Sequence, residues 1–373
     1  MTLDFERAAL YPPAARSKVQ RVAQSVRHIH GVQSLSLPIG GVVVVCLVKD
    51  GEYYVRAFIE HYLRIGAIHI VLLDNGSTDR TLDISAEYDR VTSVECRLPF
   101  GEHKLAMRQF IAEAYGHNHW CLSVDIDELW EFPFWDQMPL GSFVQYLEES
   151  GFTACVAHQL DLFGEGTITN AGGTDGSLAD LRFFDLSDIF RWRGIPSGGD
   201  FCPDERLKRF FSGNIVSTPS LPVMARGVRW RLFGVTPILT KMSLFRVVQP
   251  IVPFVSTSHR LEGAVLADVS CVLRHMLLNH HLAAKAARCA QAENYYNNSA
   301  HYKRIADTLA LAPVHLPVRR RLYQSVNDLV EMDFLCVSPE FAKFANSHGC
   351  LAGRQRVARE IRTTATTRHT TYE

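Results

Sequence analysis

The sequence predicts an α/β protein whose main part is a Rossmann-like parallel sheet flanked by helices, spanning residues 41–130. Two apolar runs, "GVVVVCLV" (41–48) and "IHIVLLD" (68–74), lack alternating polar residues, as strands covered on both faces do. Between them, "YYVRAFIEHYLRIG" (53–66) has helical apolar spacing. The same alternation of strand and helix continues to residue 130, and it favours parallel pairing through right-handed crossovers.

The elements follow one another closely along this part of the chain. Gly66 is expected to end the first helix. In the turn "NGSTD", Ser77 or Thr78 is expected to cap the helix that follows. In chain order we expect a strand at 41–48, a helix at 53–66, a strand at 68–74, a helix at 80–88, a strand at 91–97, a helix at 104–115 and a strand at 119–127.

After residue 130 the pattern is less regular. Residues 164–203 are rich in glycine and aspartate, which favours loops of the kind that often lie over an active site. Strand-like segments return at 237–248 and 268–278, and residues 280–348 have a helical pattern. We therefore expect a helical N-terminal extension (1–38), a main domain (39–280), C-terminal helices (281–350) and a flexible tail (351–373).

Composition limits the classes of function. The 373 residues are 47% hydrophobic, enough for a large core. Charge is balanced, with 39 basic and 39 acidic residues, so no global field favours nucleic acid as a partner. Nine cysteines are scattered without a C-x-x-C pair, which argues against a disulfide framework or a zinc site and fits a reducing cytoplasm.

The N-terminal region has no pattern of a signal peptide, and the longest apolar runs are shorter than the ~20 residues of a membrane helix. Residues 17–30, "SKVQRVAQSVRHIH", place apolar side chains on one helical face and basic side chains elsewhere. This helix is expected to pack on the main domain, and the alternative is a peripheral contact with the inner face of a membrane. The expected location is the cytoplasm.

The strand "HWCLSVDID" ends in three acids within four residues, Asp125, Asp127 and Glu128. Alternate residues of a strand share a face, so Asp125 and Asp127 should project together beyond its carboxyl end, where open α/β sheets bind ligands. Mg²⁺ and Mn²⁺ prefer such oxygen ligands and often complete their shell with phosphate. A D-x-D pair arises by chance about once in a chain of this length. The alternative is therefore solvated acids at a turn.

Two further groups extend this predicted site. Asp74 ends the strand 68–74 at the same sheet edge, where it could accept a hydrogen bond from a ribose or a base. The alternative is a capped turn without a ligand. Lys104 and Arg108 form an i, i+4 pair on the helix before the acidic strand and could stabilise a departing diphosphate, or lie on a solvated helix face.

The order of these motifs resembles the family 2-type glycosyltransferases of the GT-A fold, in particular a bacterial subgroup with K-N-E, D-N-x-S-x-D and D-x-D-E motifs. The resemblance covers roughly residues 41–305. A glycine is inserted in the first motif, and Leu129 replaces an aromatic residue in the last. Blocks around "LTKMSLFR", "STSHRL" and "VLRHMLLNHHLAAK" match more weakly. The matching positions are Lys49 to Glu52, then Glu60, His61 and Gly66, then Asp74 to Thr81, then Asp125 to Leu129.

The resemblance implies a GT-A domain that transfers a sugar, with inversion, from a nucleotide sugar, UDP-linked, to a hydroxyl acceptor. The acceptor would be a glycan, a lipid-linked compound or another hydroxyl compound, as in bacterial polysaccharide biosynthesis. Mn²⁺ or Mg²⁺ would be held by Asp125 and Asp127 with a later histidine, His275 as first choice and His259 as second. The expected donor-binding residues are Lys49, Glu52, Asp74, Lys104, Arg108 and Asp125.

An inverting transfer also needs a base for the acceptor proton. Glu128 could be this base or could orient its neighbours. Among Asp161, Glu165, Asp204 and Glu205 in the loop-rich half, Asp161 and Asp204 are favoured. Two other functions remain open with the same fold: a metal-dependent nucleotidyl- or phosphotransferase, and a non-catalytic nucleotide-binding module.

Overall fold

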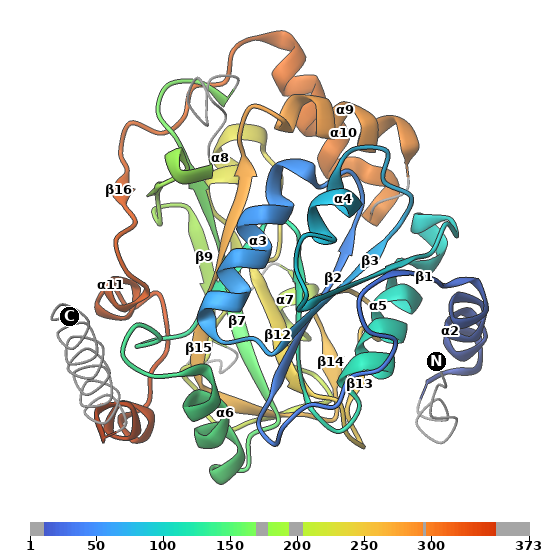
Figure 1. Cartoon of the computed structure of the whole chain (residues 1–373). Helices are drawn as coiled ribbons and strands as arrows, with labels where there is room; N and C mark the ends of the chain where they lie inside the picture. The colour runs from blue at the N-terminus through green and yellow to red at the C-terminus, as the bar shows by residue number, and fades with distance from the viewer. Residues whose placement is uncertain (1–10, 169–177, 194–203, 294–295, 348–373) are drawn as a thin grey trace, which may run out of the picture.

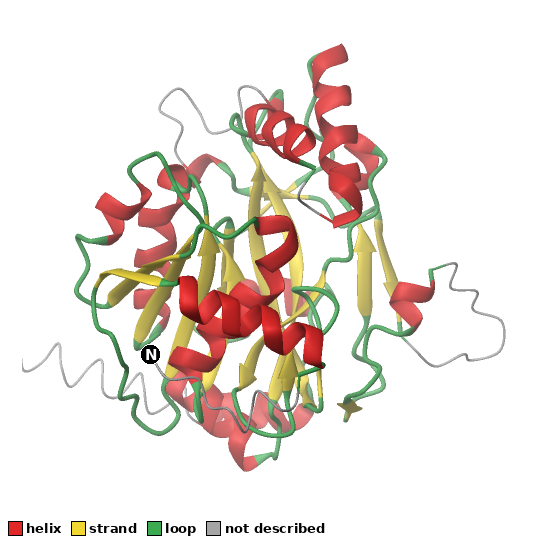
Figure 2. Ribbon diagram, turned by 90° about the vertical axis from the view of Figure 1, so that its right-hand side faces the viewer, coloured by secondary structure: helices red, strands yellow, loops and turns green. Residues whose placement is uncertain are grey.

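The computed structural model describes residues 11–168, 178–193, 204–293 and 296–347, and the statements below concern these residues. They form a mixed α/β structure in which helices cover both faces of a large central sheet (Figures 1 and 2). The tail 351–373 and parts of the loop-rich segment 164–203 lie outside the described residues.

One half of the sheet is parallel, as the sequence predicts. Strands β2 (Val42–Val48), β3 (His69–Asp74), β4 (Val91–Glu95) and β5 (Trp120–Asp125) lie in the order β4-β3-β2-β5, each parallel to its neighbours. The strand order reverses direction between β2 and β5, and ligands bind at such a switch point in open α/β sheets. At the other edge, β1 (Arg27–His30) adds an antiparallel strand to β4.

The other half of the sheet is mixed. Strand β12 (Thr240–Arg246) lies between β5 and β7 (Ala154–Phe163) and is antiparallel to both. Strand β15 (Val265–Leu278) is parallel to β7, and β6 (Glu128–Glu131) pairs antiparallel with β15. The strand-like segments at 237–248 and 268–278 are thus confirmed as β12 and β15. A segment distant in sequence thereby lies directly beside the acidic strand.

Burial on both faces explains the unbroken apolar strands. Alternate residues of β2 point to opposite faces of the sheet. Val44 and the β2 residues on its face contact α3 (Glu52–Ile65), whereas Val45 and the β2 residues on the other face contact α5 (Phe100–Gly116). Helix α6 (Leu140–Glu149) shares the face of α3. A strand without an exposed face has no position that favours a polar residue.

Two local predictions about helix ends have different outcomes. Gly66 ends α3 with φ of 109°, a left-handed conformation that glycine adopts without strain. The predicted cap of the next helix is wrong. Helix α4 (Thr81–Ser85) has Arg80 at its N-cap without a side-chain hydrogen bond. The Ser77 hydroxyl instead donates to the Asp74 carboxylate. The Ser77 hydroxyl is therefore engaged within the turn and does not cap α4.

The N-terminal helix packs on the sheet layer. Helix α2 (Pro13–Ser25) contacts α5, and its apolar residues Val19 and Val22 are buried in that contact. Lys18 Nζ donates to the carbonyl oxygen of Glu102 at 3.1 Å. The apolar face that suggested a membrane contact therefore lies against α5. Within the described residues, no helix combines the length and hydropathy that crossing a bilayer requires.

Helices follow β15 in the C-terminal region. Helices α9 (Leu282–Ala292) and α10 (Tyr296–Leu311) pack side by side (Figure 1). The helical prediction for 280–348 is thus correct for these two, whereas strand β16 (Arg321–Leu322) interrupts the later part. The remaining elements are β8 (Phe183–Phe184), β9 (Ile189–Trp192), α7 (Glu205–Lys208), β10 (Ile215–Val216), β11 (Val223–Arg226), α8 (Val228–Phe233), β13 (Val252–Pro253), β14 (Leu261–Glu262), α11 (Val326–Glu331) and a single turn at Leu178–Asp180.

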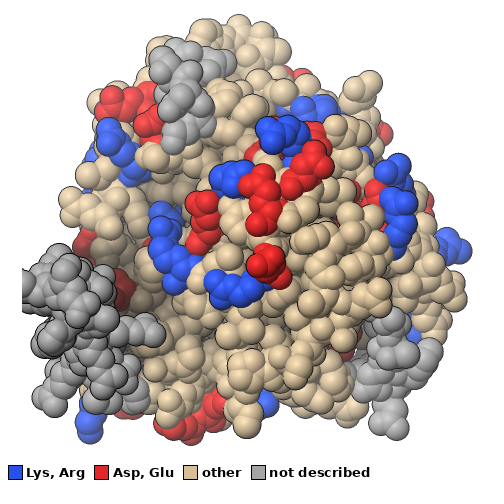
Figure 3. Space-filling view, in the orientation of Figure 1, with Lys and Arg blue, Asp and Glu red and all other residues tan. Residues whose placement is uncertain are grey.

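Surface charges of both signs lie close together on the face that carries α3 and α4. Figure 3 shows basic and acidic side chains interspersed there. One such pair joins Arg56 to Glu87 at 2.8 Å. Within the described chain the cysteines are free thiols and most are buried, with the sulfurs of Cys155 and Cys271 3.4 Å apart.

Candidate active site

The three acids predicted from the sequence lie at the switch point of the sheet. Asp125 is the last residue of β5, Asp127 lies in the turn that follows, and Glu128 is the first residue of β6. Their exposure differs: the Asp125 side chain is 31% exposed, that of Asp127 5% and that of Glu128 0%. Each is paired with a cation, so the acids do not form a simple solvated turn.

Asp125 is neutralised by two cations from distant elements. Arg108 of α5 donates Nη2 to Asp125 Oδ1, and Lys241 of β12 places Nζ 3.1 Å from Oδ2. Lys241 is completely buried and also lies 2.7 Å from Glu128 Oε2. Burial alone would raise the pKa of Asp125, but Arg108 and Lys241 outweigh burial and hold that pKa well below its ordinary value. We call Arg108, Asp125, Glu128 and Lys241 the Asp125 cluster.

Glu128 has its carboxylate fully engaged. It accepts the backbone N–H of Asp125 at 2.8 Å and the side-chain amide of Gln159 at 2.6 Å, in addition to Lys241. A carboxylate held by three donors and shielded from solvent is poorly placed to accept a proton from a substrate. Of its two possible roles, the geometry supports orienting its neighbours.

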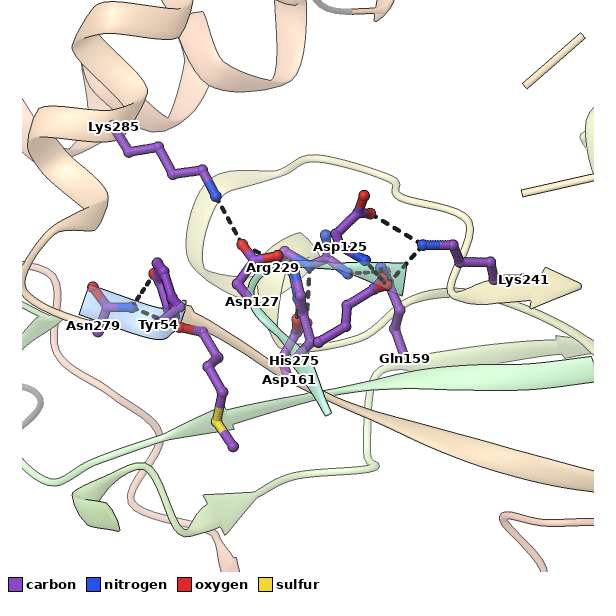
Figure 4. A network of polar contacts seen from close by, with 12 residues as sticks. Tyr54, Asp125, Asp127, Gln159, Asp161, Arg229, Lys241, His275, Asn279 and Lys285 are labelled. Atoms are coloured by element: carbon purple, nitrogen blue, oxygen red, sulfur yellow. Dashed lines mark hydrogen bonds and ion pairs between the residues drawn. The ribbon is translucent and has the colours of Figure 1, made fainter. Parts of the chain in front are cut away.

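Asp127 has a different environment. Lys285 of α9 places Nζ 2.7 Å from Asp127 Oδ2, and His275 Nε2 lies 3.8 Å from the same oxygen. His275 Nδ1 donates to Asp161 Oδ1 at 2.7 Å. Figure 4 shows Lys285 and Lys241 approaching the acids from opposite sides. We call Asp127, Asp161, His275 and Lys285 the Asp127 cluster.

The contact with Asp161 determines which nitrogen of His275 faces Asp127. An ionised carboxylate only accepts hydrogen bonds, so Nδ1 carries the proton in the neutral imidazole. In that tautomer Nε2 carries the lone pair, and it lies 3.8 Å from Asp127 Oδ2. Asp161 is itself held by Arg229 of α8, whose Nε donates to Oδ2 at 2.9 Å. A histidine oriented by a carboxylate in this way is typical of metal ligands.

Gln159 joins the two clusters. Its amide nitrogen donates to Glu128, and its amide oxygen accepts from Arg229 Nη2 at 2.9 Å. The two clusters therefore form one continuous polar network, part of which Figure 4 shows. Besides His275, the network contains four carboxylates (Asp125, Asp127, Glu128, Asp161) and four Lys or Arg side chains (Arg108, Arg229, Lys241, Lys285), so each carboxylate has a basic counterpart without a ligand.

The residues present can be tested against a divalent ion. In the described part of the chain, no group of three or more His, Cys, Asp or Glu side chains is arranged as a metal site. Mg²⁺-like ions, however, often take one or two protein ligands and complete their shell with water and phosphate. Asp127 Oδ2 and His275 Nε2, 3.8 Å apart, fit such a partial site. Asp125 fits less well because its oxygens are held by Arg108 and Lys241.

The other predicted donor-binding residues lie around the same edge. Lys49 is exposed directly after β2. Glu52, at the start of α3, accepts the backbone N–H of Arg80 at 3.1 Å. Asp74 is buried and accepts the backbone N–H groups of Gly76 and Ser77, so its carboxylate shapes its own turn.

Lys104 lies one helical turn before Arg108, and the described contacts join it to neither Asp125 nor Asp127. Its Nζ is 6.0 Å from the centre of the Phe100 ring. Burial lowers the pKa of Lys104, and the charge of Arg108 adds to this effect. The pair predicted from sequence is therefore split: Arg108 joins the network, and Lys104 lies beside it.

His259 and Asp204 lie apart from Asp127. His259 Nδ1 donates to the carbonyl oxygen of Thr240 at 3.0 Å, and burial, together with the charge of Lys241, lowers the pKa of His259 to about 4. Asp204 caps α7 by accepting the backbone N–H of Arg206 and pairs with that side chain at 2.6 Å. The structure thus brings His275, not His259, to Asp127.

Four members of the network were given no role from the sequence: Gln159, Arg229, Lys241 and Lys285. Lys241 had a usable signal, since it is the only charge within the apolar stretch "LTKMSLF". A lysine inside a buried strand requires an acidic partner. Lys285 and Arg229 each share a helix with one other basic residue, Arg288 and Arg231, and the sequence does not distinguish an inward side chain from a solvated one.

No protein-family model and no curated protein matches the chain. Among solved structures, it is similar to glucosyl-3-phosphoglycerate synthase from Mycobacterium tuberculosis, crystallised with Mn²⁺, uridine diphosphate and glucosyl-3-phosphoglycerate. The identity is 14% and the TM-score 0.22; the match covers 36% of this chain and 52% of that chain, about half its length. Similarity at this level carries no argument about activity.

Proposed function

We propose that the chain is a glycosyltransferase that uses Mn²⁺ or Mg²⁺ to transfer a sugar, with inversion, from a UDP-linked donor to a hydroxyl acceptor. The observation that carries the proposal is the pair of ligand atoms Asp127 Oδ2 and His275 Nε2, facing each other at 3.8 Å at the switch point of the sheet. The ordered sequence motifs around Asp74 and Asp125 support it.

The residues of the site have distinct parts in this proposal. Asp127 and His275 would hold the ion, which supplies positive charge to the departing diphosphate. Asp161 keeps the proton of His275 on Nδ1. Arg108 Nη1 is buried and makes no hydrogen bond to any described residue, so this nitrogen can donate to an anionic ligand. Asp125 and Glu128 keep Arg108 and Lys241 in position.

The candidate bases for the acceptor proton differ in how their carboxylates are engaged. Both oxygens of Asp161 are occupied, by His275 and by Arg229. Glu128 is buried and held by three donors. Asp204 is also paired, with Arg206, but it lies outside this network and its side chain is 26% exposed, so we propose it as the base. A loss of turnover in Asp204→Asn with donor binding unchanged would support this role.

The acceptor and the setting rest on the sequence resemblance alone. We propose a glycan, lipid-linked or other hydroxyl acceptor and a part in bacterial polysaccharide biosynthesis in the cytoplasm. The donor-side roles of Lys49, Glu52, Asp74 and Lys104 have the same basis.

A panel of nucleotide sugars with Mn²⁺, assayed for nucleoside diphosphate release, tests the proposal. One donor should give turnover that a chelator abolishes. Asp127→Asn should lower the turnover on the order of 10²–10³-fold, as removal of a charge-stabilising group does, whereas the exposed control Asp89→Asn should leave it unchanged. Full activity in Asp127→Asn would contradict the proposal. Pyrophosphate release without sugar transfer would indicate a nucleotidyltransferase instead.

A further inference from the structure

A single carboxylate oxygen in the site faces two different groups. Asp127 Oδ2 lies 2.7 Å from the ammonium group of Lys285 and 3.8 Å from His275 Nε2. His275 Nδ1 donates to Asp161, so Nε2 is the ring nitrogen that faces Asp127. A buried carboxylate requires a compensating cation, and the Lys285 ammonium group contacts this oxygen.

We propose that Lys285 is an exchangeable counter-ion of this site. It neutralises Asp127 while no divalent ion is bound, and it leaves Asp127 for the diphosphate of the donor when the ion binds. This inference rests on the proposed function, since it assumes that Asp127 and His275 are metal ligands.

The attachment of Lys285 suits such a movement. Helix α9 is anchored by its buried residues Leu282 and Ala286, whereas the Lys285 side chain is 24% exposed. A lysine side chain has several rotatable bonds, so its ammonium group can move while the helix remains in place. Lys241 offers the contrast: it is 0% exposed, lies within a central strand and is held by two carboxylates.

The charge of the network supports coupling between the ion and the nucleotide. Four carboxylates already face four Lys and Arg side chains, so a divalent ion bound without an anion would add positive charge that no carboxylate of the network compensates. A diphosphate brings the compensating negative charge and offers Lys285 a new partner. The ion should therefore bind weakly alone and more tightly with the nucleotide, and the coupling must be reciprocal.

Mn²⁺ binding in the absence of nucleotide tests the exchange directly. Free Mn²⁺ is measured by electron paramagnetic resonance for the wild type, Lys285→Met and Lys303→Met, the last being a matched control whose lysine pairs with Glu293 at the surface. Lys285→Met removes the competing cation and should bind Mn²⁺ more tightly, by roughly 5- to 150-fold, the usual range of coupling between sites. Lys303→Met should bind as the wild type does.

Two further measurements complete the test. With saturating Mn²⁺, UDP should bind Lys285→Met more weakly than the wild type, because the diphosphate loses its contact with the ammonium group. Without metal, Lys285→Met leaves Asp127 buried and without Lys285, so Mn²⁺ should raise its melting temperature more than that of the wild type. This second measurement also shows that the variant folds.

The outcomes separate this inference from the proposed function. If Asp127→Asn binds Mn²⁺ as the wild type does, or if no form binds Mn²⁺ with or without UDP, both proposals are overturned. If Asp127→Asn loses Mn²⁺ binding but Lys285→Met binds Mn²⁺ no more tightly than the wild type, the exchange is overturned and the metal site stands.

Discussion

The Asp125 cluster and the Asp127 cluster lie in one polar network, yet their cations are attached differently. Asp125 is held by Arg108 and the completely buried Lys241, both anchored in the core. Asp127 is held by Lys285, a partly exposed side chain of a peripheral helix, and it also faces His275. Two acids only two residues apart in sequence therefore have different surroundings.

This difference indicates a division of roles. An acid paired with buried, fixed cations contributes to the structure, because removal of either partner leaves an uncompensated charge. An acid that faces an imidazole and a movable lysine can exchange its partner for a ligand. The first cluster thus maintains the shape of the site, and the second is suited to bind. The predictions below test this division, from the largest expected effect to the smallest.

Replacing the fixed lysine should have the largest effect on stability. In Lys241→Met, Glu128 loses its cation and Asp125 one of two, so the free energy of unfolding should fall by about 3–5 kcal/mol, as when one partner of a buried pair is removed. Chemical denaturation measures this change. Lys303→Met, at an exposed pair, should cost about 0–1 kcal/mol. Adding Glu128→Gln to Lys241→Met should restore part of the lost free energy of unfolding. If Lys241→Met and Lys303→Met lost equal stability, the distinction between fixed and exposed pairs would be wrong.

The next largest effect is expected in Mn²⁺ affinity, where the two candidate histidines should differ. His275→Gln should weaken Mn²⁺ binding by more than roughly 100-fold, beyond the usual effect of a group that only supports a ligand. His259→Gln should change it little, because the His259 imidazole donates to the carbonyl oxygen of Thr240. Titration calorimetry with Mn²⁺ and UDP compares the two. A greater loss of Mn²⁺ affinity in His259→Gln than in His275→Gln would indicate that the ion binds at the Asp125 cluster instead.

A smaller effect is expected at Asp161. Asp161→Asn should weaken Mn²⁺ binding roughly 10- to 100-fold, because His275 loses the carboxylate that orients it. At saturating Mn²⁺ the turnover number should return close to the wild-type value. If Asp161 were instead the catalytic base, turnover would stay roughly 10²–10⁴-fold low at any Mn²⁺ concentration.

The sequence predicted the part of the fold that local patterns control. The four strands predicted between residues 41 and 127 correspond to β2, β3, β4 and β5, and Gly66 ended α3. The caps predicted at Ser77 and Thr78 were wrong because the Asp74 carboxylate binds the Ser77 hydroxyl. That contact joins residues three apart, so it is local to the turn.

Local sequence thus determined that Asp125 and Asp127 lie at the carboxyl end of a buried parallel strand, since strand periodicity acts over a few residues. Tertiary structure alone decided their partners. Strand β12 inserts between β5 and β7 and brings Lys241 to Asp125, and α9 brings Lys285 to Asp127. Pairing between segments more than a hundred residues apart depends on the packing of the whole sheet, which no short pattern encodes.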